Sequence, residues 1–172
     1  MILRKLICLA LVLPLWAVVP SPSLAEDKAD TPLPAGTRVA TFAGGCFWCV
    51  ESDFDHAPGV LRTVSGYTGG TLENPSYGQV TAGGSGHREA VQIFFDPKVI
   101  AYRDLVEIFW RTVDPTDAGG QFCDRGFSYT TAIFANSPAQ ERIARASKSK
   151  LEASGILKRP VVTPILRAGT FY

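Results

Sequence analysis

The chain of 172 residues carries 17 Lys and Arg against 16 Asp and Glu, which gives a formal net charge of +1 at pH 7. This balance, without a run of clustered basic residues interleaved with aromatic ones, gives no indication of nucleic-acid binding. Without the N-terminal segment described next, the remaining length suits one domain that buries about two-thirds of its unfolded surface.

The N-terminal segment has the three-part layout of a secretory signal peptide. Basic residues at 4–5 precede an almost wholly apolar run over 6–19, and small residues occupy the outer positions of 23–25. The apolar run is too short for a comfortable bilayer crossing. We therefore expect cleavage after residue 25, with Cys8 removed, and an exported protein, periplasmic or secreted, without stable membrane insertion after cleavage. An uncleaved membrane anchor is the alternative.

The rest of the chain divides into a leader and one domain. Residues 26–37 are charged, contain prolines and lack hydrophobic periodicity, so we expect a flexible leader before a single domain over 38–172. Two long polar loops are expected at 66–86 and 114–126. In chain order, strands are predicted at 38–43, 60–67, 89–95, 129–135 and 161–166, and helices at 46–55, 102–109 and 137–154. This order predicts an α+β fold, a two-layer sandwich of helices on a mixed sheet.

Three cysteines remain after cleavage, Cys46, Cys49 and Cys123, and an odd number leaves at least one thiol unpaired in an exported protein. Cys46 follows two glycines at a predicted strand-to-helix junction. A helix N-terminus favours the thiolate, which is the form of cysteine that attacks. Cys49 lies one helical turn further on and can form a disulfide with Cys46. These features predict a nucleophile at Cys46 and a second thiol that traps its oxidised form.

The cysteine pair has two alternative interpretations. A zinc site needs further ligands, and only Cys123, His56 and His87 are available, without the paired spacing of a ligand set. A purely structural disulfide between residues 46 and 49 would close a very small loop and contribute little stability. We therefore expect no bound metal or cofactor, and redox catalysis is the better interpretation.

The segment Gly45-Cys46-Phe47-Trp48, together with Glu51, resembles the signature of the A-type peptide methionine sulfoxide reductases. The resemblance covers nearly all of residues 38–172, because further motifs follow in the order expected for that family. They lie at 66–70, 74–77, 86–91, 109–110, 114–116 and 124–129. Several motifs in the correct order are a far more specific signal than a lone pair of cysteines.

The resemblance implies a ferredoxin-like core and the reduction of methionine S-sulfoxide, in peptides, proteins or free, to methionine. In that family the cysteine thiolate attacks the sulfoxide sulfur, and the resulting sulfenic acid forms a disulfide with a resolving cysteine. The implied role is repair of oxidised proteins by a monomeric enzyme without a bound cofactor. Its partners would be oxidised peptides or proteins and an external thiol reductant, either thioredoxin-like or a small dithiol.

Motif positions also imply roles for individual residues. Glu89 would be the acid that protonates the departing oxygen, a role that requires a carboxyl with a raised pKa. Tyr77 and Tyr129 would be the two phenols that hydrogen-bond the oxygen. Phe47 and Trp48 would form an aromatic wall that holds the methyl group of the substrate, and Asp124 would be a carboxylate that helps orient the substrate. Taken singly, Phe47 and Trp48 could be ordinary core, Glu89 an exposed charge and Asp124 a turn cap. His87 is expected to be structural.

Departures from the family pattern leave some questions open. Cys49 stands where Gly is common and Cys123 where Asn is common, so both are candidate resolving residues. Ala101 replaces a common Ser cap, which typically costs ~1 kcal/mol. Relatives usually continue past the equivalent of 171–172 into a His-Gln-Asp-Tyr-like segment, so we expect a missing family tail. The other functional hypotheses are a general thiol–disulfide oxidoreductase using residues 46 and 49 and an inactive, truncated binding module.

Overall fold

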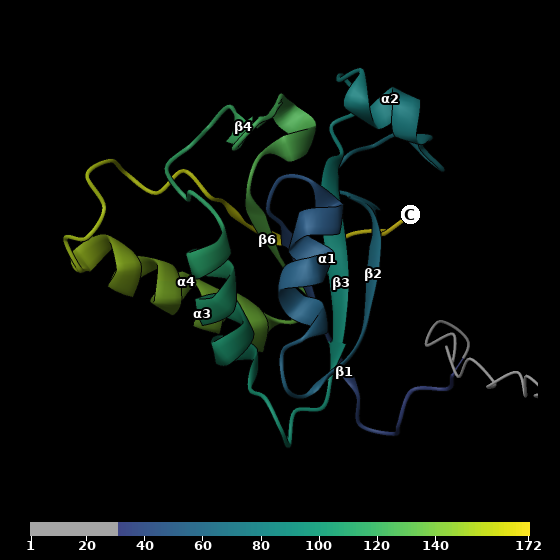
Figure 1. Ribbon diagram of the computed structural model, residues 1–172, viewed down its shortest axis with the longest axis vertical. Coiled ribbons are helices and arrows are strands. Elements are labelled where there is room, and N and C mark those ends of the chain that lie inside the picture. The colour runs from purple at the N-terminus through teal and green to yellow at the C-terminus, as the bar shows by residue number, and fades with distance from the viewer. Residues whose placement is uncertain (1–30) are drawn as a thin grey trace, which may run out of the picture.

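A computed structural model describes residues 31–172, so the predicted signal peptide and the first part of the leader lie outside the described residues. Within them, helices cover one face of a five-stranded sheet (Figure 1). This is the predicted α+β fold of helices on a mixed sheet. No helix of residues 31–172 has the length and apolar character needed to cross a membrane.

The sheet combines antiparallel and parallel pairs. Its strand order is β2-β3-β1-β6-β7, with antiparallel pairing throughout except for the parallel pair of β6 and β7. The strands are β1 (Arg38–Ala43), β2 (Val60–Thr68), β3 (Arg88–Phe95), β6 (Ala132–Ala135) and β7 (Ile165–Arg167). The helices are α1 (Phe47–Asp55), α2 (Tyr77–Thr81), α3 (Tyr102–Thr112) and α4 (Pro138–Ala153).

Alternate residues of the strands build two apolar layers, one on each face of the sheet. The larger layer lies between the sheet and helices α1, α3 and α4, and it contains fully buried aromatic side chains such as Phe42, Phe54 and Phe109. The smaller layer, centred on Phe134, is covered by Ala168 and Phe171 of the C-terminal segment. Both faces of the sheet are therefore packed, which holds β1 and β3 rigidly at its centre.

The predicted starts of α3 and α4 agree with the structure, whereas α3 ends at Thr112, three residues beyond its predicted end. Ser137 caps α4 by accepting a hydrogen bond from the Gln140 N–H at 3.2 Å. Ala101 gives α3 no side-chain cap, as expected from the missing Ser. The Asp104 carboxylate instead accepts the Ala101 N–H at 3.2 Å, which satisfies one donor at this helix start.

Two predicted strands were placed wrongly at their beginnings. The strand predicted at 129–135 begins only at Ala132, because residues 127–129 form a 3-10 turn that continues from Gly126, whose φ is 124°. The strand predicted at 161–166 is β7, which begins only at Ile165. Pro164 has no N–H to donate to a ladder, and the preceding Val162 N–H bonds instead to the Pro115 carbonyl at 2.8 Å.

The two predicted loops contain short regular elements. α2 lies within 66–86, and Ser76 and Gln79 close a capping box at its N-terminus. A small hairpin of β4 (Gly120–Gln121) and β5 (Asp124–Arg125) lies within 114–126. In Figure 1 both elements lie at the same end of the molecule as the N-terminus of α1. This end of the sheet carries the candidate site.

Candidate active site

The bend between β1 and α1 places Cys46 at a helix N-terminus, as predicted. Gly45 has a φ of 97°, a conformation that suits glycine. Cys46 is the N-cap residue, and its carbonyl accepts the N–H groups of Cys49 and Val50 at 3.1 and 3.2 Å. Because the side chain is partly exposed, its sulfur lies where the helix dipole favours an anion and a substrate can reach it.

Glu89 of β3 is buried beside this helix start, with 1% of its surface exposed. Its Oε2 accepts a hydrogen bond from the Phe47 N–H at 2.9 Å, so the carboxyl is fixed next to the residue that follows Cys46. Burial raises the pKa of Glu89, and the nearby Asp124 charge adds to this, while the Phe47 hydrogen bond opposes it. The protonated carboxyl needed for an acid is therefore favoured.

Two phenols, Tyr129 and Tyr67, interact with Glu89, and a third, Tyr77, interacts with both of them. Burial raises the pKa of Tyr129 to about 12, and the charge of Glu89 and a hydrogen bond with Tyr77 contribute to that rise. The pKa of Tyr67 is also raised, by burial, by Glu89 and by Tyr77. Tyr129 and Tyr67 therefore share one electrostatic environment with the carboxyl, and the more exposed Tyr77 lies beside them. The two whose pKa values are raised, Tyr129 and Tyr67, remain protonated hydrogen-bond donors at neutral pH.

Tyr67 was not predicted as a site residue. It lies directly opposite Glu89 in the antiparallel pairing of β2 and β3, and its ring centroid is 5.8 Å from that of Phe47. Its backbone N–H and carbonyl bond to Tyr172 at 2.9 and 3.0 Å. The motif at 66–70 could have drawn attention to it, but only the strand register shows that it faces the carboxyl.

The predicted aromatic wall divides into a buried and an exposed member. Phe47 is 8% exposed and belongs to the main core, whereas Trp48 is 68% exposed. Their ring centroids are 5.7 Å apart, and Tyr77 lies 6.4 Å from Phe47. The wall therefore begins in the core and extends to the surface beside Cys46, where an apolar methyl group can pack against it.

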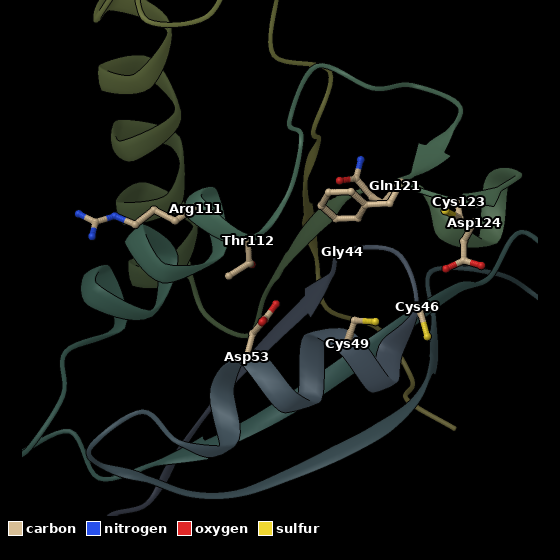
Figure 2. A pocket seen from close by; sticks show the side chains of 10 residues that line it. Gly44, Cys46, Cys49, Asp53, Arg111, Thr112, Gln121, Cys123 and Asp124 are labelled. Carbon is tan, nitrogen blue, oxygen red and sulfur yellow. The ribbon is translucent and has the colours of Figure 1, made fainter.

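The other two thiols lie across a groove of about 550 Å³ that Cys46 also lines (Figure 2). Cys49 is exposed on α1, and Cys123 is exposed in the turn between β4 and β5. Burial, the Cys46 sulfur and its hydrogen bond raise the pKa of Cys49, and the charges of Asp124 and Asp53 add to the rise. The structure thus brings both candidate resolving residues to the groove, with Cys49 in contact with Cys46.

The remaining predicted residues are also located. Asp124, on β5, lines the same groove. His87 is buried, its Nδ1 accepts the Gly70 N–H at 3.2 Å, and its Nε2 lies 2.7 Å from the Leu72 carbonyl. These bonds tie the first long loop to β3, which fits the structural role expected for His87. Residues 31–172 contain no group of three or more His, Cys, Asp or Glu side chains able to hold a metal ion.

A thiol at a helix N-terminus, a buried carboxyl beside it and a second thiol in contact with it define a cysteine-dependent reductase. Comparison with known proteins specifies the class further. The family model described as peptide methionine sulfoxide reductase matches residues 38–172. The peptide methionine sulfoxide reductase MsrA of Bacillus velezensis is 58% identical over 135 residues, which cover 78% of this chain and 76% of that one.

Solved structures agree with this assignment. Methionine sulfoxide reductase A of Corynebacterium diphtheriae superposes with a TM-score of 0.73 at 30% identity, covering 90% of this chain and 77% of that chain. Reduced Mxr1 from Saccharomyces cerevisiae gives a TM-score of 0.75 at 29% identity, covering 83% and 82%. The chain belongs to the peptide methionine sulfoxide reductase family. It is an enzyme that reduces methionine sulfoxide to methionine.

Proposed function

We propose that Cys46 is the nucleophile of this reaction, Glu89 its acid and Tyr77 and Tyr129 its oxygen-binding phenols. The observation that carries this assignment is the hydrogen bond between the Glu89 carboxyl and the Phe47 N–H at 2.9 Å. That bond fixes a buried carboxyl within one residue of the thiol. Because the pKa of Glu89 is raised, the carboxyl can hold a proton and donate it to the sulfoxide oxygen.

The proposed first half-reaction balances on these residues. The Cys46 thiolate attacks the sulfoxide sulfur, and the oxygen takes a proton from Glu89 as its charge develops. The resulting hydroxyl passes from the substrate sulfur to the Cys46 sulfur as the bond between the two sulfurs breaks. Cys46 is left as a sulfenic acid, Glu89 as a carboxylate, and the methionine departs reduced by two electrons. The phenols donate hydrogen bonds to the oxygen, while Phe47 and Trp48 hold the methyl group. Asp124, whose charge acts on Glu89, orients the substrate.

In the second half-reaction a thiol attacks the sulfenic acid, water leaves and a disulfide forms. Cys49 is the preferred resolving residue, because it lies one helical turn from Cys46 and its thiol contacts that sulfur. Cys123 faces the same groove and is the rival. Mass mapping of the disulfide after a single turnover without reductant separates them. Cys49→Ser should prevent the 46–49 disulfide, and Cys123→Ser should leave it unchanged.

The physiological context is also part of the proposal. The substrates are methionine S-sulfoxides in oxidised peptides and proteins, together with free methionine S-sulfoxide, and the monomeric enzyme binds no cofactor. A thioredoxin-like dithiol reduces the resulting disulfide; yeast Mxr1, which shares the fold, has been solved in complex with Trx2. The basic and apolar N-terminal pattern supports export to the periplasm or beyond.

The decisive assay is reduction of a methionine sulfoxide peptide with dithiothreitol as the electron donor. The wild-type chain should turn over the S-sulfoxide and leave the R-sulfoxide, and Cys46→Ser should be inactive. Cys123→Ser serves as the matched control, since it removes a nearby thiol without removing the nucleophile. Full turnover by Cys46→Ser, or none by the folded wild type, would refute the assignment.

A further inference from the structure

The residues around Cys46 divide into two sets. One set contains Glu89, the phenols and the aromatic wall, and none of these residues lines the groove that holds Cys49. Only Cys46 and Asp124 line this groove and also belong to the proposed sulfoxide site. Apart from these two residues, the groove is therefore lined by different residues from the proposed sulfoxide site. We call it the thiol groove, lined by Gly44, Cys46, Cys49, Asp53, Arg111, Thr112, Gln121, Phe122, Cys123 and Asp124.

We propose that the thiol groove is the docking site of a protein dithiol that reduces the enzyme, with Phe122 as its apolar anchor. This inference rests on the proposed resolving chemistry. A disulfide between Cys46 and Cys49 has its more exposed sulfur, that of Cys49, on this groove. A reductant must attack a sulfur that it can reach, so it approaches from the thiol groove.

Phe122 is the first residue of a two-residue hairpin loop, a position that requires a positive φ and that glycine usually occupies. It lies at the tip of the β4–β5 hairpin with a φ of 51°, in the left-handed region that bulky residues rarely adopt. Its side chain is 76% exposed, so burial in the folded chain does not compensate for the strain. Strained residues of this kind cluster at ligand clamps and switch regions. An exposed aromatic ring beside the groove is the kind of anchor that protein interfaces use.

The hairpin that carries Phe122 is held rigidly. The buried Gln121 side chain accepts the Asp114 N–H at 2.7 Å and donates to the Asp114 carbonyl at 2.9 Å. A Cβ built on Gly45 would lie 2.7 Å from the Gln121 Cβ, so the hairpin packs directly on the bend before Cys46. Phe122 is therefore presented at a fixed place relative to the reactive thiols. Pre-organisation of this kind lowers the entropic cost of binding.

The charges of the thiol groove restrict the partner further. Asp53 and Asp124 act on Cys49 as nearby negative charges. Figure 2 shows the Arg111 guanidinium directed away from the cysteines, so this positive charge does not offset the two aspartates there. An acidic partner surface would be repelled. The occupant is therefore a protein dithiol whose contact surface is apolar to basic around its reactive cysteine.

The electron balance of the proposed step is complete. A thiolate of the partner attacks the Cys49 sulfur, the bond to Cys46 breaks and Cys46 leaves as a thiolate. The second partner thiol then attacks the mixed disulfide, and Cys49 leaves. The partner is oxidised by two electrons to a disulfide, and both enzyme thiols are restored.

The test compares two electron donors in the full-length enzyme. Phe122→Gly removes the ring while glycine accommodates the positive φ. With a bacterial thioredoxin kept reduced by its reductase and NADPH, we expect the KM for thioredoxin to rise at least about ten-fold. With dithiothreitol, the kcat and the KM for the sulfoxide peptide should stay at wild-type values. Phe122→Tyr retains the ring and should behave as wild type with both donors.

Ile156→Ala is the matched control, because Ile156 is an equally exposed apolar residue, at 77%, outside the thiol groove. It should leave both KM values unchanged. An unchanged thioredoxin KM in Phe122→Gly would overturn the proposal, as would an equal rise in the peptide KM with dithiothreitol. Failure of thioredoxin to support wild-type turnover would also overturn it. Failure of the proposed function is distinct, since the wild type would then be inactive with dithiothreitol.

Discussion

Replacement of Glu89 by Gln separates acid catalysis from packing. The Gln side chain keeps an oxygen that can accept the Phe47 N–H, a buried bond of 2.9 Å in the wild type. It removes the proton that the sulfoxide oxygen needs. General acids contribute typically 10²–10⁴-fold to rate, so the rate constant for sulfoxide reduction should fall by about that factor. Stability should be unchanged or higher, because a buried carboxyl is replaced by a neutral group of the same shape.

The pH dependence gives the sign of the effect. The pKa of Glu89 is raised by burial, so the rate of reduction in the wild type should decline as pH rises through that pKa. Between the unfolded and folded pKa values the native state binds more protons than the unfolded state. The carboxyl's stabilising contribution is therefore present below the unfolded pKa and is lost as pH rises through the folded pKa. In Glu89→Gln, neither the reduction rate nor the stability should decline over this pH range.

Single-turnover reduction of a methionine sulfoxide peptide measures the rate, and urea unfolding measures the stability. Glu89→Ala is the comparison variant, because it also leaves the buried Phe47 N–H without an acceptor, at a cost of about 1–3 kcal/mol. The reasoning fails if Glu89→Gln keeps the wild-type rate within about three-fold, well short of a general acid's usual contribution. It fails equally if the Gln variant is as unstable as the Ala variant.

Three further substitutions test the surrounding structure. Tyr129→Phe should lower kcat/KM by about 10- to 100-fold, the worth of one hydrogen bond to developing charge. Its pH profile should keep the wild-type shape, because a pKa of about 12 keeps the phenol protonated at working pH. Gly45→Ala should cost about 2–4 kcal/mol in urea unfolding, since its Cβ meets Gln121 at a φ of 97°; Gly78→Ala, with open space around it, should cost nothing. Gln121→Leu should lose about 2–4 kcal/mol, because the Asp114 N–H and carbonyl lose their partners.

The elements that local pattern specifies were predicted well. β1, β3, α3 and α4 have strong apolar periodicity or clear caps, and the structure places them within a few residues of the predicted positions. The start of β7 depends on a proline at 164 and on the Val162 N–H, which bonds to the distant Pro115. α2 carried a signal that was overlooked, the Ser and Gln of its capping box at positions 76 and 79. The short length of this helix and its Gly78 concealed it within a polar segment.

The candidate site shows the same division between local and long-range information. The position of Cys46 follows from two glycines and a helix start, both readable along the chain. The roles of Glu89 and the phenols came from resemblance, and the structure adds the physical reason, a shared buried environment. Tyr67 could not be found without the register of β2 against β3. The thiol groove depends on a hairpin that lies more than 70 residues after Cys46 in the chain, and no local pattern joins the two.

Separation of the sulfoxide site from the thiol groove has a kinetic consequence. A sulfoxide peptide and a protein reductant that use these two sets of residues share only Cys46 and Asp124. The methionine product must still leave before Cys46 exchanges its bonds, since the same sulfur serves both half-reactions. Double-reciprocal plots at several thioredoxin concentrations should therefore be parallel, as ping-pong kinetics require. Excess peptide should inhibit thioredoxin-supported turnover only if the peptide also covers Phe122. Intersecting lines in the double-reciprocal plots, together with strong inhibition by the peptide, would therefore contradict the two-surface arrangement.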